Sequence, residues 1–86
     1  MNAFKVKFFS PDNYISFDRV LSVLVNGMEG KLMIQANHAP YLICILSGEV
    51  VVKMNNQKEE KFMIDRGMLE IADNNCSIVT SEFRVI

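Results

Sequence analysis

The sequence predicts an all-β protein, a single antiparallel β-sandwich of about 8–10 short strands. Apolar residues recur with a period of two, beginning with Phe4, Val6 and Phe8, which alternate with lysines. Turn residues separate the apolar runs, and no stretch has the 3.6-residue period of an amphipathic helix. The chain has 86 residues, too few for two ordinary cores, so one domain over residues 1–86 is expected.

Turn signals define the expected strands. Ser10-Pro11-Asp12-Asn13 predicts a turn, because Pro sets φ while Asp and Asn bond their own backbone. Asn26-Gly27 is expected to break the chain. Asn55-Asn56 predicts a tight hairpin, since Asn tolerates the left-handed conformation that a primed turn requires. Further turns are expected at 65–67 and 73–75. The strands expected between the turns cover residues 4–8, 15–18, 20–25, 31–34, 41–46, 49–54, 61–64, 68–72 and 76–80.

Several of these strands are apolar on both faces, although one face of a sandwich normally meets water. Scattered surface hydrophobes are one explanation, because they are normal on soluble proteins. A docking surface for another protein is the other, since large apolar patches mark interfaces and Met adapts well to them. The residues taken to form this second apolar face are Val20, Leu24, Met33, Met63 and Met68.

Charge and hydropathy exclude several classes of partner. The formal net charge is −1 and no segment collects a run of like charges, so neither nucleic-acid binding nor attraction to anionic lipid is expected. The N-terminus alternates apolar residues with lysines, unlike a signal peptide. The longest apolar run, 39–46, is far shorter than the roughly 20 residues that span a bilayer. Any membrane association is therefore expected to go through a partner, without direct insertion.

The nucleophiles and metal ligands of the chain are few. Cys44 and Cys76 each lie inside an apolar run and follow no metal-ligand spacing, so both are expected to be reduced core residues of a cytosolic protein. The single histidine, His38, is expected to be a corner residue that bonds nearby backbone. A Cys-His catalytic pair is disfavoured because buried thiols are inert, and one histidine cannot build a cupin-type metal site. No catalytic residue, metal or cofactor is expected.

Two further patterns have simple structural explanations. Gly27-Met28-Glu29-Gly30 matches the G-x-x-G loop of KH domains, but it joins two expected strands and Glu29 would repel phosphate. A tight turn that needs positive φ explains it better. Glu59, Glu60 and Asp65 are expected to be solvated charges near turns.

Short motifs recur in a fixed order along the chain. A V-x-S-V-x-V-like strand at 20–25 precedes G-x-E-G-x-L-x-I at 27–34 and His38-Ala39-Pro40. A glycine follows ten residues after that histidine, at Gly48, and then come F-x-I at 62–64, Gly67, L-E-I at 69–71 and an N-x-V-like strand at 75–78. In their order and spacing these motifs resemble the N-terminal β-sandwich domain of the epsilon subunit of bacterial F-type ATP synthase, called delta in mitochondria. The resemblance covers essentially all 86 residues.

The chain departs from the family pattern at several positions. Met33 stands where a small residue is common, Ser47 where proline is, and Arg66 where a second glycine is. Lys31 stands where an acidic residue is common, so no charge pairing is carried over from the family. The C-terminal helical hairpin of many epsilon subunits, which inhibits ATP hydrolysis, has no counterpart in these residues. The expectation is a short form without that inhibition, either natural or truncated.

The resemblance implies a non-catalytic rotor subunit of a proton-translocating F-type ATP synthase. Such a subunit couples c-ring rotation to the gamma subunit, binds no nucleotide in this short form, and is peripheral on the cytoplasmic face of the bacterial inner membrane (the matrix side in an organelle). The family places the G-x-E-G turn at the ring-facing end, which implies c-ring contacts at Met28, Glu29 and Lys31, with His38 nearby. Gamma is expected on the second apolar face defined above.

Two alternatives remain open at the level of sequence. One is a small cupin-like metal-binding protein, suggested by the rhythm of the strands around Gly48 and Gly67. The other is a free-standing β-sandwich adaptor that binds some protein other than gamma.

Overall fold

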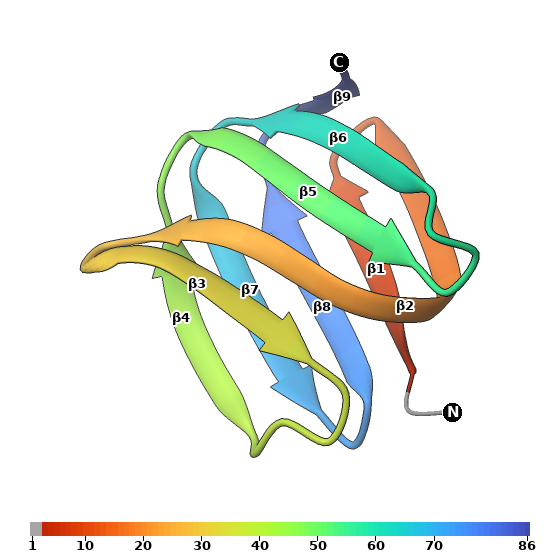
Figure 1. The fold of residues 1–86 in the computed structure, drawn as a ribbon. Coiled ribbons are helices and arrows are strands. Elements are labelled where there is room, and N and C mark those ends of the chain that lie inside the picture. Colours follow the sequence, from red (N-terminus) through yellow and green to blue (C-terminus); the bar gives the residue numbers. More distant parts are fainter. Residues whose placement is uncertain (1–2) are drawn as a thin grey trace.

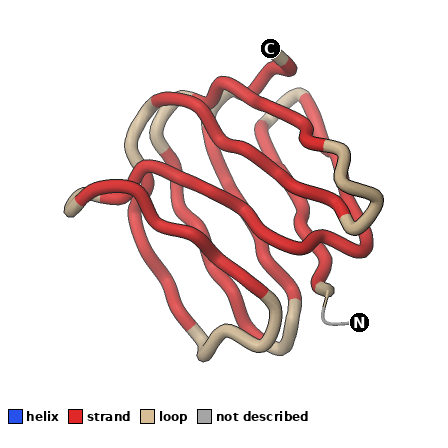
Figure 2. The backbone as a smooth tube through the Cα atoms, in the orientation of Figure 1, coloured by secondary structure: helices blue, strands red, loops and turns tan. Residues whose placement is uncertain are grey.

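The computed structural model describes residues 3–86, and these form nine strands joined by short loops, which confirms the all-β class (Figures 1 and 2). No helix occurs in this part of the chain. The strands are β1 (Phe4–Ser10), β2 (Asn13–Gly27), β3 (Gly30–Gln35), β4 (Tyr41–Ile45), β5 (Gly48–Met54), β6 (Glu59–Ile64), β7 (Gly67–Ala72), β8 (Asn75–Thr80) and β9 (Phe83–Val85).

The strands form two packed layers, as a sandwich requires (Figure 1). The rear layer has the order β1-β8-β7-β4, and the front layer has the order β3-β2-β5-β6-β9. β2 belongs to both layers, because its first residues pair with β1 and its later residues pair with β3 and β5. All pairings are antiparallel except that of β1 with β8, which is parallel.

β2 is one strand of 15 residues, not the two strands that the sequence predicted. The expected break at Asn26-Gly27 was wrong, since β2 continues through Gly27 and the turn follows it. A β-bulge interrupts the pairing with β5 between Val20 and Ser22, beside Arg19 with φ 57°. The extra residue makes Val20 and Val23 both point into the core, three positions apart. Val20 is fully buried, so its assignment to an exposed apolar face was wrong.

The core fills the space between the two layers. At its centre Phe8 stacks on Phe62 with ring centroids 4.6 Å apart, and Phe83 lies 5.5 Å from Phe8. The other buried apolar residues come from β1 to β8 and alternate along each strand, as the period of two predicted, except across the bulge in β2. They are Phe4, Val6, Val20, Val23, Val25, Ile34, Ile45, Val50, Val52, Ile64, Leu69, Ile71, Cys76 and Ile78.

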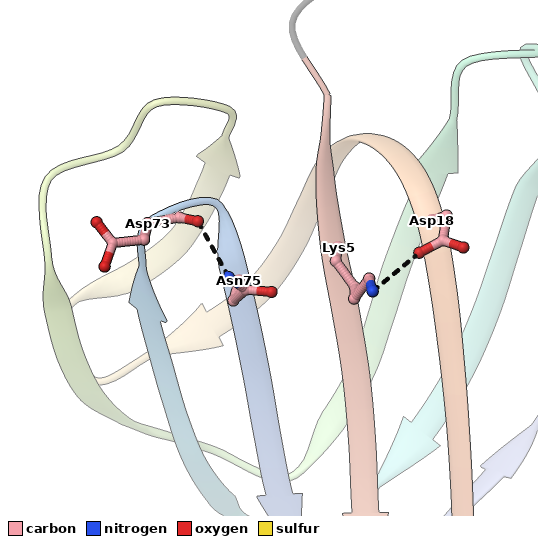
Figure 3. A network of polar contacts seen from close by, with 4 residues as sticks. All are labelled: Lys5, Asp18, Asp73 and Asn75. Carbon is pink, nitrogen blue, oxygen red and sulfur yellow. Dashed lines mark hydrogen bonds and ion pairs between the residues drawn. The ribbon is translucent and has the colours of Figure 1, made fainter.

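The hairpin turns follow local chemistry to different degrees. Asp73 and Asn74 both have positive φ between β7 and β8, as a primed two-residue turn requires. The Asn75 side chain donates to the carbonyl of Asp73 at 3.0 Å (Figure 3). The loop between β5 and β6 is longer than the tight hairpin predicted at Asn55-Asn56, and its positive φ lies at Gln57.

β1 and β2 are also joined by their side chains. Lys5 on β1 forms an ion pair with Asp18 on β2, with Nζ 3.6 Å from Oδ1 (Figure 3). Both side chains are largely exposed, so this pair contributes little stability. Pairing of the strands themselves is what closes this side of the sandwich.

Asp65 holds three loops together at the other end of the sandwich. Its Oδ1 accepts from Ser47 Oγ at 3.0 Å and from its neighbour's backbone, Arg66 N, at 3.0 Å, while Oδ2 accepts from Ser81 Oγ at 2.9 Å. These hydrogen bonds favour the ionised carboxylate and lower the pKa of Asp65, those from Ser81 and Ser47 most strongly. Asp65 is exposed in its loop, as expected of a solvated charge near a turn, and it also links these three loops.

Candidate protein-protein interfaces

The turn between β2 and β3 projects from the sandwich and borders an open hollow. The turn is Met28-Glu29, flanked by the paired residues Gly27 and Gly30. Gly30 has φ +123°, a conformation that a side chain rarely adopts, whereas Gly27 has no positive φ. The positive φ expected in this motif is thus needed at Gly30 alone. In Figure 1 the tip of this hairpin lies at the far left of the molecule.

The hollow has a volume of about 560 Å³ and lies between this hairpin and β4. Met28, Glu29 and Lys31, the three residues singled out for ring contact, all line it, together with Tyr41 and Cys44 of β4. Met28 is 76% exposed at the tip. The hollow therefore combines an apolar wall with one carboxylate and one ammonium, a surface suited to a mixed polar and apolar loop of another protein.

His38 lies next to the hollow and does not line it. Its Nδ1 donates to the carbonyl oxygen of Ala39 at 2.7 Å, as expected for a corner residue that bonds nearby backbone. The imidazole also lies against Tyr41, with ring centroids 5.6 Å apart. His38 is thus in contact with one lining residue of the hollow, Tyr41.

An apolar row crosses the outer face of the rear layer. Cys44 pairs with Met68, Met68 with Val79, Val79 with Phe9, and Phe9 with Tyr14. All five side chains are exposed, Val79 by 53% and Tyr14 by 55%. Cys44 Sγ lies 3.4 Å from Met68 Sδ, and the rings of Phe9 and Tyr14 are 5.1 Å apart. We call these five residues the rear row.

A smaller apolar stripe crosses the outer face of the front layer. Leu24 on β2 pairs with Met33 on β3 and with Val51 on β5, and Met63 of β6 lies on the same face. Met33 is 51% exposed, whereas the other three are half-buried. We call these four residues the front stripe. The structure therefore divides the predicted docking residues: Leu24, Met33 and Met63 lie in front, Met68 behind and Val20 in the core.

The sequence reading missed most of the rear row. Phe9, Tyr14 and Val79 were not singled out, and Cys44 was expected in the core, which was wrong. Each is one apolar residue on the solvent side of its own strand, which is unremarkable alone. Only the pairing of five strands, one of them parallel, brings them into a single row. The extra aromatic residue at the end of β1 was the one available signal, since Phe9 breaks the alternation that ends at Phe8.

The described residues include a buried thiol and no cluster of metal ligands. Cys76 is buried, and burial raises the pKa of its thiol to about 12, so it stays protonated. No group of three His, Cys, Asp or Glu side chains that could hold a metal ion occurs within 3–86. No helix in that range is long and apolar enough to cross a membrane.

Comparison with known proteins agrees with this architecture. Residues 3–85 match the family described as ATP synthase, Delta/Epsilon chain, beta-sandwich domain. The chain is 61% identical over 85 residues to an ATP synthase epsilon chain of Wolbachia pipientis wMel, covering 99% of this chain and 75% of that one. A second Wolbachia epsilon chain, from the Culex pipiens strain wPip, is 59% identical over the same coverage.

Solved structures share the fold. A chain of the Euglena gracilis mitochondrial ATP synthase (OSCP/F1/c-ring) superimposes with a TM-score of 0.88 at 18% identity, covering 98% of this chain and 53% of that one. A chain of the Tetrahymena thermophila mitochondrial ATP synthase central stalk and c-ring gives 0.77 at 21% identity, with 93% and 64% covered. This chain therefore spans only about half to two thirds of those chains. By its β-sandwich domain, the chain belongs to the delta/epsilon family of ATP synthase, whose members are non-catalytic subunits of the complex.

Proposed function

We propose that this chain is the epsilon-type subunit of the central stalk of a proton-translocating F-type ATP synthase, and that it couples rotation of the c-ring to the gamma subunit. The observation that carries the proposal is the family match over residues 3–85, together with 61% identity to an epsilon chain. The chain reaches the membrane through this complex, on its cytoplasmic face in a bacterium.

The rear row is the surface that we assign to gamma. It runs unbroken across five strands, and its side chains are exposed, from Cys44 at one side to Tyr14 at the other. An exposed apolar row on so small a domain is typical of an interface. Its Tyr and Met residues are also among the types enriched in the centres of interfaces. The front stripe is the weaker candidate because most of its area is already covered by neighbouring side chains.

The hollow beside the β2–β3 hairpin is the surface that we assign to the c-ring. Glu29 and Lys31 offer both signs of charge at the rim, and Met28 offers an exposed apolar tip. A projecting hairpin tip with an open hollow behind it is a surface that a polar loop of another protein can contact. The rear row and this hollow meet at Cys44, so one molecule can contact both partners at once.

A β-sandwich suits mechanical coupling because its core is close-packed and deforms little under load. Here the two assigned surfaces stand on one continuous set of paired strands, from β4 through β7 and β8 to β1. Torque applied at the hairpin would therefore pass to gamma through backbone hydrogen bonds and the aromatic core, without a hinge.

Co-purification with gamma tests the proposal. The intact chain should bind gamma, and Val79→Lys, which places an ammonium in the middle of the rear row, should weaken binding by about tenfold or more. Val51→Lys makes the same chemical change on the front stripe and should leave binding nearly unchanged. If the folded wild-type chain fails to bind gamma, the proposed function is wrong. If only Val51→Lys weakens binding, the assignment of the face is wrong.

The ring assignment needs a separate readout. In a reconstituted synthase, Glu29→Lys should lower ATP-driven proton pumping relative to ATP hydrolysis, since it reverses the charge at the hollow. Glu59→Lys makes the same charge reversal at the start of β6, away from the hairpin tip (Figure 1). It should leave the ratio of proton pumping to ATP hydrolysis unchanged. Equal pumping by both variants would argue against the hollow as the ring contact.

A further inference from the structure

β3 is an edge strand whose outer side is open. It pairs with β2 on one side, and no other strand among residues 3–86 pairs with it. In Figure 1, β3 is the lowest strand of the front layer. An edge strand presents a row of unpaired N–H and C=O groups that can template pairing with another chain. Proline and bulges, which usually protect edges, are absent from Gly30–Gln35.

The hydrogen-bonding pattern between β2 and β3 decides which backbone groups of β3 have no partner in β2. The carbonyl of Asn26 accepts from the N–H of Leu46 at 2.8 Å, so Asn26 points away from β3. Asn26 and its partner Lys31 are therefore a pair without mutual hydrogen bonds. Backbone groups of successive residues in a strand point alternately to its two sides. The N–H and C=O groups of Lys31, Met33 and Gln35 therefore point away from β2, toward the open edge. The open edge ends at Asn37, whose N–H is already bonded to Asn74.

This edge is complementary to itself. If two copies pair antiparallel about Met33, each Met33 exchanges both hydrogen bonds with the other, and Lys31 does the same with Gln35 of the second copy. Lysine then faces glutamine, so no like charges meet. On the inner side, Leu32 faces Ile34 of the other copy. On the outer side, Met33 faces Met33, which joins the two front stripes into one longer apolar stripe.

We propose that two copies of this chain associate through antiparallel pairing of their β3 strands, with Met33 on the two-fold axis. The occupant of the edge is a second copy, because the register that satisfies the outward groups also matches side chains and avoids charge repulsion. The inference is independent of the proposed function, since it uses the geometry of β3 alone. Because Lys31 would take part in both, the paired form and ring contact at the hollow would exclude each other.

The experiment measures the mass of the purified chain by light scattering from micromolar to millimolar concentration. The wild-type chain should form a dimer, and Met33→Pro should remain a monomer, because proline removes the outward N–H without breaking the β2 ladder. Met33→Thr keeps that N–H and should still dimerise. Val79→Lys, which alters the rear row on the opposite face, should dimerise like the wild type.

A second measurement needs no variant. In a dimer mixed from labelled and unlabelled chains, the Hα atoms of Leu32 and Ile34 from different copies should show an intermolecular nuclear Overhauser effect, since antiparallel non-hydrogen-bonded pairs are close. A monomer at millimolar concentration, a dimer that survives Met33→Pro, or a dimer lost in Val79→Lys would each overturn the proposal. The same holds for a dimer that lacks the Leu32–Ile34 effect.

Discussion

Asn37 and Asn74 bind each other reciprocally although they are 37 residues apart in the sequence. The backbone N–H of Asn37 donates to Oδ1 of Asn74 at 2.7 Å, and Nδ2 of Asn74 donates to Oδ1 of Asn37 at 3.1 Å. Both residues have positive φ, which Asn tolerates better than most residues. The pair ties the corner that contains His38-Ala39-Pro40 to the β7–β8 turn, and so holds together one end of the sandwich.

This pairing predicts a measurable loss on substitution. Asn74→Gly keeps a residue that accepts positive φ but removes both side-chain hydrogen bonds, so it should lower the free energy of unfolding by about 1–2 kcal/mol. Asn56→Gly in the β5–β6 loop makes the same change where the side chain bonds only locally, to Lys58 N. Asn56→Gly should therefore lower the free energy of unfolding by less than Asn74→Gly does. Urea unfolding measures both free energies, provided that the m-value is the same in each variant. Equal losses of stability would contradict a stabilising role for the Asn37–Asn74 pair.

Asp65 predicts a particular dependence of stability on pH. Its pKa is lowered from 3.8 in the folded chain, so its contribution is present above that ordinary pKa and is lost as pH falls through the lower, folded pKa. Asp65→Asn should therefore be less stable than the wild type near neutral pH, and the difference should shrink at about pH 2. Urea unfolding at the two pH values checks this. A difference that stays constant with pH would mean that ionisation of Asp65 is unimportant.

The two cysteines are predicted to react differently. Cys44 is exposed, whereas Cys76 is buried with its pKa raised to about 12, so little thiolate is available there. In the folded chain a thiol reagent should modify Cys44 alone, and Cys76 should react only after unfolding. Mass spectrometry after labelling counts the modified thiols. In Cys44→Ser no label should appear under native conditions; rapid labelling of that variant would show that Cys76 is accessible.

Position 67 is predicted to require glycine, because there is no space for a side chain there. A Cβ at this position would collide with the carbonyl oxygen of Val79 on the paired strand β8. Because backbone atoms cannot move aside cheaply, Gly67→Ala should cost about 1–3 kcal/mol. Gly27→Ala is the matched control, since its Cβ would meet Gly30 O at 3.2 Å, a tight contact without a clash. Thermal or urea unfolding compares them, and an equal cost would refute the steric explanation.

Much of the fold could be predicted from local patterns. Strand alternation, the turn at Asp73-Asn74 and the role of His38 as a corner residue all depend on neighbours in the sequence, and the structure agrees with each. The hollow could be anticipated in part, because Met28, Glu29 and Lys31 lie within one hairpin. The hydrogen bonds of Asp65 could not be predicted, since its partners Ser47 and Ser81 come from other loops.

By itself the sequence determined the class of fold and the motifs that mark the family, because these depend on short-range periodicity and spacing. The tertiary structure alone decided which apolar residues share a surface. A single bulge turned Val20 into the core, and the parallel pairing of β1 with β8 placed Phe9 beside Val79. A side chain's face depends on strand register, and register is set by contacts between residues far apart in the chain.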